Sequence, residues 1–446
     1  MRTALALLLA GLALGGCATK PMTVECDPFR ARYAKPVPRS ATMVEIQSGA
    51  EPVVGAQARN SLVASLDSTL SAAFMRDGNQ GPALLALSGG GQWGAFGAAY
   101  LEELDSQSGT KLPKFDIITG VSTGALQALF VGAAQADENG RAAYLAELTR
   151  QYSPESEREI VHRTHKYLAP IKGAVAKLGP LRRRIEAALC AKNPADPSAP
   201  GACPLIERLA APGAPTVLLG FVAAATGEMQ YINVTQIARE AVAPAPQGPR
   251  IDMTTAQQCI TGGALASVAM PFFYQQVQVA SLKPDRDEPA EPVTYLDGGV
   301  RQSMFLVETT LAATELAARK RAASSAPLIH LVRNGPTVAL PDPDADGKRD
   351  AISSAERGYS LIVNQSEVMA IETIRLRYAE ADIKLATADG YDRPFPQGST
   401  RFCRKEDSEA MFEPGFMKCL QALGRHKAGD DAGDPKNGWI ILTSPR

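Results

Sequence analysis

The sequence predicts an α/β fold with a central, mainly parallel sheet. Short apolar segments alternate along the chain with segments of helical character, and glycine-rich turns follow two of the apolar segments. Strands that alternate with helices form parallel sheets that helices cover on both faces. With 446 residues, of which 45% are hydrophobic, the chain can bury a large core.

The N-terminal 80 residues show little regular patterning. Residues 18–55 are rich in proline and lack periodicity, which predicts a tether. Leu62, Leu66, Leu70 and Phe74 recur every four residues, and this spacing predicts one amphipathic helix.

The central part of the chain carries the alternating elements of the predicted sheet. Residues 83–87 and 115–118 are short apolar strand segments, and helical stretches follow them at 93–104 and 124–134. Further strands are predicted at 216–223, 229–234, 293–296 and 328–332.

The C-terminal part is less regular. Residues 350–386 predict a long helix or a pair of helices, and the remainder has only a few apolar anchors, such as Trp439. We therefore expect a helical or irregular C-terminal extension. The predicted division of the chain is a signal peptide at 1–16, a tether with one helix at 17–80, the main α/β domain at 81–340 and the extension at 341–446.

The N-terminus predicts export and a lipid anchor. Residues 3–14 form an apolar run after a charged start, and this run is too short to span a bilayer, which needs about 20 residues. Residues 14–17 (Leu-Gly-Gly-Cys) resemble a bacterial lipobox, which implies cleavage before Cys17 and its acylation. Ala18 then favours the outer membrane of the cell envelope, facing the periplasm or the surface. A plain secretory signal that contains a cysteine is the alternative.

Six further cysteines of an exported chain would meet an oxidising environment. Cys190 and Cys203 flank a loop rich in proline and alanine, whose closure would contribute about 3 kcal/mol. Cys403 and Cys419 form a second local candidate pair. Cys259 lies in apolar surroundings and is interpreted as a small buried hydrophobic residue. The sequence does not fix the connectivity.

Charge and ligand patterns argue against several function classes. Lys+Arg 46 and Asp+Glu 47 give a net charge of −1, which argues against a nucleic-acid binder. No Cys-x-x-Cys pattern occurs, and His162 and His165 lack a neighbouring acidic or cysteine ligand, so no metal or cofactor is expected. Residues 342–347 open like a calcium loop, but Ser353 stands where a bidentate Glu is needed, which favours a solvated linker. The basic run 163–184 is interpreted as a solvated face, with anionic lipid head groups as the alternative.

The central motif is Gly-x-Ser-x-Gly at residues 120–124. It lies between a predicted strand and a helix rich in alanine and leucine. A serine on such a tight turn projects from the backbone near a helix N-terminus, where free N–H groups favour negative charge. Ser122 is therefore the candidate nucleophile, and Gly120 and Gly124 are the small residues that permit the turn.

A glycine-rich loop follows the strand at 83–87. Gly89, Gly90 and Gly91 come directly after Ser88, and consecutive glycines let backbone N–H groups approach a ligand. A phosphate cradle and an oxyanion hole both fit this pattern. No Gly-Lys-Ser/Thr or dinucleotide motif follows, and the nearby serine motif favours the oxyanion hole.

A third motif, Asp297-Gly298-Gly299, directly follows the strand at 293–296. An aspartate at the end of a strand is well placed to act as a base. A tight turn with a capping aspartate is the alternative interpretation.

Together and in this order, the three motifs resemble those of the patatin-like phospholipase family over about residues 82–335. The family's glycine loop, nucleophile elbow, Ala-Ser-x-Ala-x-Pro segment and Asp-Gly-Gly element match residues 89–91, 120–124, 266–271 and 297–299. Two positions differ from the family pattern. Trp93 stands where the family often has arginine, and residues 303–305 (Ser-Met-Phe) replace an Asn-x-Pro segment.

The resemblance implies a three-layer α/β/α fold and a lipid acyl hydrolase with a dyad in place of a triad. Ser122 would attack an ester carbonyl, Asp297 would accept its proton, and the loop amides would stabilise the oxyanion. The expected substrates are phospholipids or lysophospholipids, at a membrane to which the lipid anchor holds the enzyme. Three alternatives remain: an acyltransferase with the same dyad, a triad esterase that uses His330 or His426, and a non-catalytic binding lipoprotein.

Overall fold

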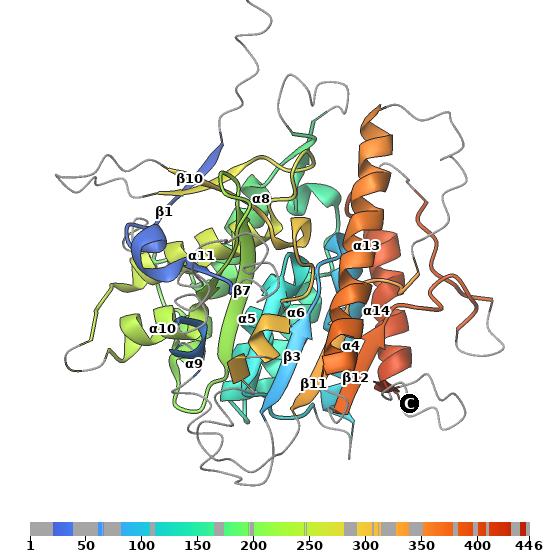
Figure 1. The fold of residues 1–446 in the computed structure, drawn as a ribbon, viewed down its shortest axis with the longest axis horizontal. Helices are drawn as coiled ribbons and strands as arrows, with labels where there is room; N and C mark the ends of the chain where they lie inside the picture. The colour runs from blue at the N-terminus through green and yellow to red at the C-terminus, as the bar shows by residue number, and fades with distance from the viewer. Residues whose placement is uncertain are drawn as a thin grey trace, which may run out of the picture.

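A computed structural model of the chain gives the arrangement of its helices and strands (Figure 1). The structure describes residues 21–38, 61–64, 66, 82–107, 112–164, 174–194, 196, 200–244, 246, 248–280, 292–305, 307–310, 312–313, 327–338, 351–377, 382–395, 400–406, 410–429 and 438–442.

A mixed sheet forms the centre of the molecule. Its strands are β1 (Met22–Glu25), β2 (Lys35–Pro36), β3 (Ala83–Leu87), β4 (Ile117–Val121), β7 (Thr216–Ala223), β8 (Met229–Asn233), β9 (Val277–Ala280), β10 (Val293–Asp297), β11 (Leu328–Arg333), β12 (Asp382–Thr387) and β13 (Ile440–Leu442). They follow the order β1-β9-β10-β7-β4-β3-β11-β12-β13, and β8 pairs with β7 and β2. In the stretch β7-β4-β3-β11-β12 of this order, all neighbouring strands are parallel. The strands β3, β4, β7 and β11 therefore all end at the same edge of the sheet. A separate ribbon joins β5 (His162–Arg163) to β6 (Ala176–Lys177).

Helices cover both faces of this sheet. The long helices are α4 (Gly94–Ser106), α5 (Thr123–Ala136), α6 (Arg141–Gln151), α8 (Gly179–Leu189), α9 (Pro204–Ala210), α10 (Val234–Val242), α11 (Met253–Val268), α13 (Ala351–Arg377) and α14 (Pro414–Ala428). Short helical turns are η1 (Phe29–Tyr33), η2 (Gly91–Trp93), η3 (Glu157–Glu159) and η5 (Gly298–Val300).

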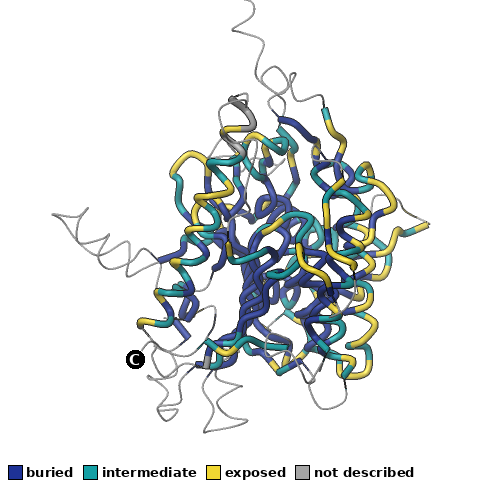
Figure 2. Tube along the Cα trace, turned by 90° about the vertical axis from the view of Figure 1, so that its right-hand side faces the viewer, coloured by how far each residue is buried: buried dark blue, intermediate teal, exposed yellow. Residues whose placement is uncertain are grey.

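Side-chain alternation in β3 shows how the layers form. Leu85 and Leu87 pack into the core formed with α4, α5, α11 and α14. Leu84 packs on the opposite face with Leu62 and Leu66, and Ala86 packs there with Ile371 of α13. The sheet therefore lies between two helical layers, and its strands form the buried centre in Figure 2. This is the predicted α/β/α arrangement.

The predicted strands of the core are present, with small shifts at their ends. The strand predicted at 115–118 runs as Ile117–Val121, so the serine motif begins inside the strand. Residues 61–64 and 66 are helical and Leu62 and Leu66 are buried, in agreement with the predicted amphipathic helix. Leu70 and Phe74 lie outside the described residues.

The tether prediction is wrong for residues 21–38. β1 pairs in parallel with β9, and β2 pairs with β8, so this segment forms part of the sheet. Phe29 packs against Phe221 and Tyr295 with ring centroids 5.7 and 5.5 Å apart. The segment was missed because its strands are short and gain their stability from partners more than 190 positions later in the chain.

The prediction for the C-terminal part needs two corrections. The helix expected over 350–386 ends at Arg377, and the chain then forms β12, whose Ile383 and Leu385 are buried against the same face as Ile371. The stretch expected to be irregular contains α14, which packs on α4. A Cβ on Gly424 would lie 2.4 Å from the carbonyl oxygen of Phe96, so this glycine allows the two helices a close approach. The C-terminal part thus extends the central sheet and its helical layer.

Three disulfides link the described cysteines. Cys190 is bonded to Cys203 and Cys403 to Cys419, the two local pairs considered above. Cys259 is bonded to Cys26, 233 positions earlier. The interpretation of Cys259 as a plain hydrophobic residue is therefore wrong, because α11 brings it beside the N-terminal segment.

Several sequence predictions fall outside the described residues. These are the signal peptide, Cys17, the loop at 342–347 and His165. Within the part of the chain that is described, no helix is long and apolar enough to cross a membrane.

Candidate active site

Ser122 lies at the turn between β4 and α5. Its backbone adopts φ 54° and ψ −124°, a conformation that side chains other than glycine rarely take and that is strained at nucleophile elbows. Gly120 and Gly124 make the turn possible. A Cβ on Gly120 would lie 2.3 Å from the carbonyl oxygen of Gly124, and one on Gly124 would lie 2.2 Å from that of Leu87.

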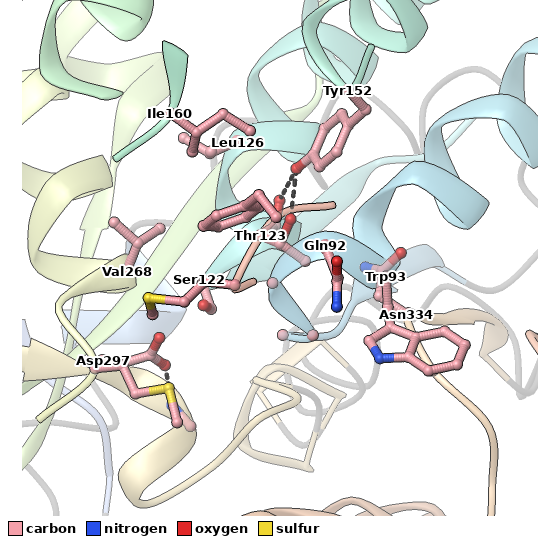
Figure 3. A pocket seen from close by; sticks show the side chains of 18 of the residues that line it. Gln92, Trp93, Ser122, Thr123, Leu126, Tyr152, Ile160, Val268, Asp297 and Asn334 are labelled. Carbon is pink, nitrogen blue, oxygen red and sulfur yellow. Dashed lines mark hydrogen bonds between the residues drawn. The ribbon is translucent and has the colours of Figure 1, made fainter. Parts of the chain in front are cut away.

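Asp297 ends β10 and is 3% exposed. Its Oδ1 accepts a hydrogen bond from the amide of Gly299 at 2.7 Å. Burial raises the pKa of Asp297 to about 6, although the side chain of Ser122 and the amide of Gly299 act to lower it. The carboxylate is therefore ionised at neutral pH and is a stronger base than a solvated aspartate. Figure 3 shows the two side chains directed into the same space.

The segment at 266–271 connects the two halves of this pair. The hydroxyl of Ser267 accepts a hydrogen bond from the amide of Ser122 at 2.9 Å and donates one to the carbonyl of Gly220 at 2.7 Å. Two residues later, the carbonyl of Ala269 accepts the amide of Asp297 at 3.0 Å. In the sequence, this segment was recognised only by its similarity to the family. In the structure, it bonds the amides of both Ser122 and Asp297 and so holds the two residues relative to each other.

The glycine loop lies beside Ser122. A Cβ on Gly89 would lie 3.3 Å from the Cβ of Ser122, and one on Gly90, which has φ 148°, would lie 2.0 Å from the carbonyl oxygen of Asn334. Gly91 begins η2, and the first N–H groups of a helix have no acceptor within the helix.

The three glycines are not equivalent as hydrogen-bond donors. The amide of Gly89 donates to the carbonyl of Ser303 at 3.1 Å, so it is already engaged. Among the described residues, the amides of Gly90 and Gly91 have no such backbone acceptor, so these two are the better candidates for the predicted oxyanion role.

A buried polar network holds the loop from behind. Asn334, which follows β11, donates from its side chain to the carbonyl of Ser88 at 2.8 Å and to the side chain of Gln127 at 2.9 Å. Gln127 of α5 also donates to the carbonyl of Gly94 at 2.8 Å. Neither Gln127 nor Asn334 was found from sequence, because neither belongs to a local motif.

Trp93 explains one departure from the family pattern. Its ring packs edge-on against Tyr391 and Phe416, with centroids 4.9 and 5.1 Å away. The preceding Gln92 accepts the amide of Glu413 through its side chain at 3.0 Å. The end of the loop therefore serves as a contact for the C-terminal part of the chain.

A large cavity of about 920 Å³ opens at Ser122 and Asp297. Its lining includes Ser122, Asp297, the loop glycines and many apolar side chains, among them Leu126, Leu129, Phe130, Ile185 and Val268. Tyr359, Val363 and Glu367, each four residues apart on α13, line it from the C-terminal part of the chain. Charged side chains such as Arg163, Arg184 and Lys405 line it as well, and a cavity with both apolar and charged walls suits an acyl chain together with a polar head group.

The two histidines of the triad alternative, His330 and His426, do not line this cavity. His330 is 2% exposed in β11 and packs against Phe115 and Trp439, and His426 of α14 stacks on Phe395. No described histidine lines the cavity. The triad alternative therefore gains no support from the geometry.

The described residues contain no group of three or more potential metal ligands. In the basic run, three arginines are paired with glutamates: Arg163 with Glu157, Arg182 with Glu186 and Arg184 with Glu159. Arg163 and Arg184 also line the cavity, so the run is not only a solvated face.

Comparisons with known proteins complete the assignment of the fold. A match among solved structures is VipD from Legionella pneumophila, with 10% sequence identity over 78% of this chain and 67% of that chain and a TM-score of 0.27. The comparison with curated proteins gives no match. The model of the family described as patatin-like phospholipase matches residues 85–311, which is half of the chain and contains the glycine loop, the serine motif, the segment at 266–271 and the Asp-Gly-Gly element. The chain therefore belongs to the patatin-like phospholipase family and is a lipid acyl hydrolase.

Proposed function

We propose that the chain hydrolyses carboxylic esters of phospholipids or lysophospholipids with a Ser122–Asp297 dyad. The observation that supports this most strongly is that Ser122, on a strained turn, and the buried carboxylate of Asp297 line the same large cavity, whose walls include many apolar side chains. A raised pKa in such a place is typical of a general base.

The first half-reaction transfers the acyl group to the enzyme. Asp297 accepts the proton of the Ser122 hydroxyl while Oγ forms a bond to the ester carbonyl carbon. The carbonyl oxygen takes up the negative charge and receives hydrogen bonds from the amides of Gly90 and Gly91. One such donor contributes about 3–4 kcal/mol to the stabilisation of the transition state. The ester C–O bond then breaks, and the alcohol leaves with the proton that Asp297 held.

The second half-reaction releases the acyl group. Asp297 removes a proton from a water molecule, which attacks the acyl-Ser122 carbonyl in the same oxyanion site. The intermediate expels Ser122, which regains its proton from Asp297, and a fatty acid is formed. One residue thus serves as base twice and as acid twice.

The N-terminal sequence supports a location for this reaction. Acylation at Cys17 would hold the enzyme at the membrane of the cell envelope, where the local concentration of lipid esters is high. This location is a proposal that rests on the lipobox-like residues 14–17.

Labelling with a fluorophosphonate tests the nucleophile. The full chain in detergent should form an adduct on Ser122, because only an activated serine reacts with this probe. Ser122→Ala should abolish the adduct and lower the hydrolysis of phospholipid esters by roughly 10⁴-fold or more. Asp297→Asn should slow both by about 10³- to 10⁴-fold.

Two controls separate a failed proposal from a failed experiment. Ser106→Ala changes an exposed serine at the end of α4 and should leave labelling unchanged. If the folded wild-type chain stays unlabelled both in detergent and on phospholipid vesicles, the dyad proposal is wrong and a binding role is favoured.

A further inference from the structure

A buried ion pair lies beside the glycine loop. Arg333 ends β11 and Glu367 lies in α13, so both are outside the residues 85–311 that match the family. Nε of Arg333 is 2.6 Å from Oε2 of Glu367, and each side chain is only 5% exposed. Both residues line the cavity that contains Ser122.

Glu367 is connected to the loop through Ser303. Its Oε1 accepts a hydrogen bond from the hydroxyl of Ser303. The carbonyl of Ser303 in turn accepts the amide of Gly89. A continuous chain of polar contacts therefore runs from Arg333 through Glu367 and Ser303 to the amide of Gly89.

The energetics of the pair argue against a purely stabilising role. Burying two charges has a desolvation cost that their attraction often fails to exceed. The Nη1 atom of Arg333 is also buried and has no hydrogen-bond acceptor among the described residues. An unsatisfied buried donor destabilises a fold by about 1–3 kcal/mol. Apolar side chains of similar size would serve stability as well or better.

The loop itself lacks charged side chains. Residues 88–93 (Ser-Gly-Gly-Gly-Gln-Trp) carry no charge, and Trp93 is directed into an aromatic cluster with Tyr391 and Phe416. Three glycines in succession also have wide conformational freedom. The position of the loop amides must therefore be set by side chains from other segments.

We propose that Glu367 is a positioning residue, oriented by Arg333, that fixes the glycine loop so that the amides of Gly90 and Gly91 face the oxyanion. Glu367 does not touch the reacting atoms in this role. It acts by holding Ser303, whose carbonyl accepts the amide of Gly89 and so anchors the loop next to Ser122. The inference rests on the proposed acyl transfer to Ser122 and names residues from the C-terminal part of the chain that this reaction requires.

A double variant separates positioning from stability. Arg333→Met with Glu367→Leu replaces the ion pair by apolar side chains, and such replacements are often neutral or stabilising. The chain should keep its melting temperature within a few degrees. With a soluble ester, kcat and the rate of fluorophosphonate labelling should fall about 10- to 100-fold, while KM changes by less than about threefold, because the loop acts in the transition state.

Three single variants serve as comparisons for the kcat and the stability of the double variant. Glu372→Gln breaks the half-exposed pair with Arg375 on the same helix and should leave kcat unchanged. Arg333→Lys keeps a cation beside Glu367 and should retain more activity than the double variant. Glu367→Gln alone leaves Arg333 buried without a counter-ion and should lower both stability and kcat.

The outcomes distinguish this inference from the proposed function. A folded double variant whose kcat and labelling rate stay within twofold of wild type overturns the inference, while labelling of Ser122 in the wild type still supports the dyad. A wild type that is not labelled overturns both. If the double variant does not fold, Ser303→Ala decides. This variant removes only the hydroxyl that donates to Glu367, so it should still fold with a moderately lower melting temperature and lower kcat about three- to tenfold. An unchanged kcat overturns the inference.

Discussion

The serine turn and the glycine loop face the same cavity, but different forces hold them. The serine turn depends mainly on close backbone contacts of Gly120 and Gly124 with each other and with the neighbouring strand β3, to which Ser267 adds one hydrogen bond. The glycine loop is fixed by hydrogen bonds from side chains that are more than 200 positions away in the sequence, such as Asn334. A short motif can encode the first kind of element but not the second.

This difference predicts opposite responses to substitution. A methyl group added to the serine turn meets backbone that cannot move, so the fold itself should fail. A side chain removed from behind the loop should leave a folded protein with misplaced amides. The following variants test this contrast.

The largest effect is expected for Gly124→Ala. The added Cβ would lie 2.2 Å from the carbonyl oxygen of Leu87, and relief would require β3 or β4 to shift. We expect a loss of about 4 kcal/mol or more in the free energy of unfolding, which is at the extreme of single substitutions. Gly358→Ala is the matched control, because nothing lies within 4 Å of its added Cβ. It should be neutral or stabilise α13 by up to about 1 kcal/mol. Equal melting temperatures for the two variants would contradict the contrast.

An intermediate effect is expected from the pKa of Asp297. This pKa is about 6 in the folded chain against 3.8 as the ordinary value, so the native state binds a proton between these pH values that the unfolded state has released. Stability therefore decreases as the pH rises through this range, by at most about 3 kcal/mol, and stays lower above pH 6.

Deprotonated Asp297 is required for activity but lowers the stability of the fold, and Asp297→Asn tests both effects. The base must be deprotonated, so kcat/KM of the wild type should fall about tenfold per pH unit below pH 6. The variant cannot ionise and should melt at a higher temperature than the wild type at pH 7.5, but not at pH 3.5. Thermal melts at both pH values provide the measurement, and a variant that is less stable at pH 7.5 would speak against the raised pKa.

The smallest effect is expected for Gln127→Leu. The substitution removes the side chain that binds Asn334 and the carbonyl of Gly94 behind the loop. We expect about a tenfold lower kcat, equivalent to roughly 1.4 kcal/mol in the transition state. Gln135→Leu is the control, because Gln135 is a second buried glutamine of α5 that binds Phe115 and Pro113, away from the cavity. Both variants should lose about 1–3 kcal/mol of stability. A reduced kcat in both would show that the loop is not specifically affected.

The core strands and the three motifs could be predicted from the sequence for a common reason. Strands such as β3 are continuous apolar runs, and the serine turn and Asp297 follow strands within a few residues. Local composition therefore marked them. β12 and α14 escaped because their stability depends on packing against β11 and α4. The partner of Cys259 escaped because no local pattern links it to Cys26.

By itself, the sequence determined that this chain builds a parallel α/β core with Ser122 and Asp297 at the ends of strands. It did so because apolar strand segments, turn glycines and the order of these segments along the chain can be read from neighbouring residues. Only the tertiary structure decided which loop amides remain available to an oxyanion and which residues hold them. Hydrogen bonds to Ser303, Asn334 and Glu367 form across the folded core, and burial in that core also raises the pKa of Asp297. These effects depend on distances in space that no short segment of the chain specifies.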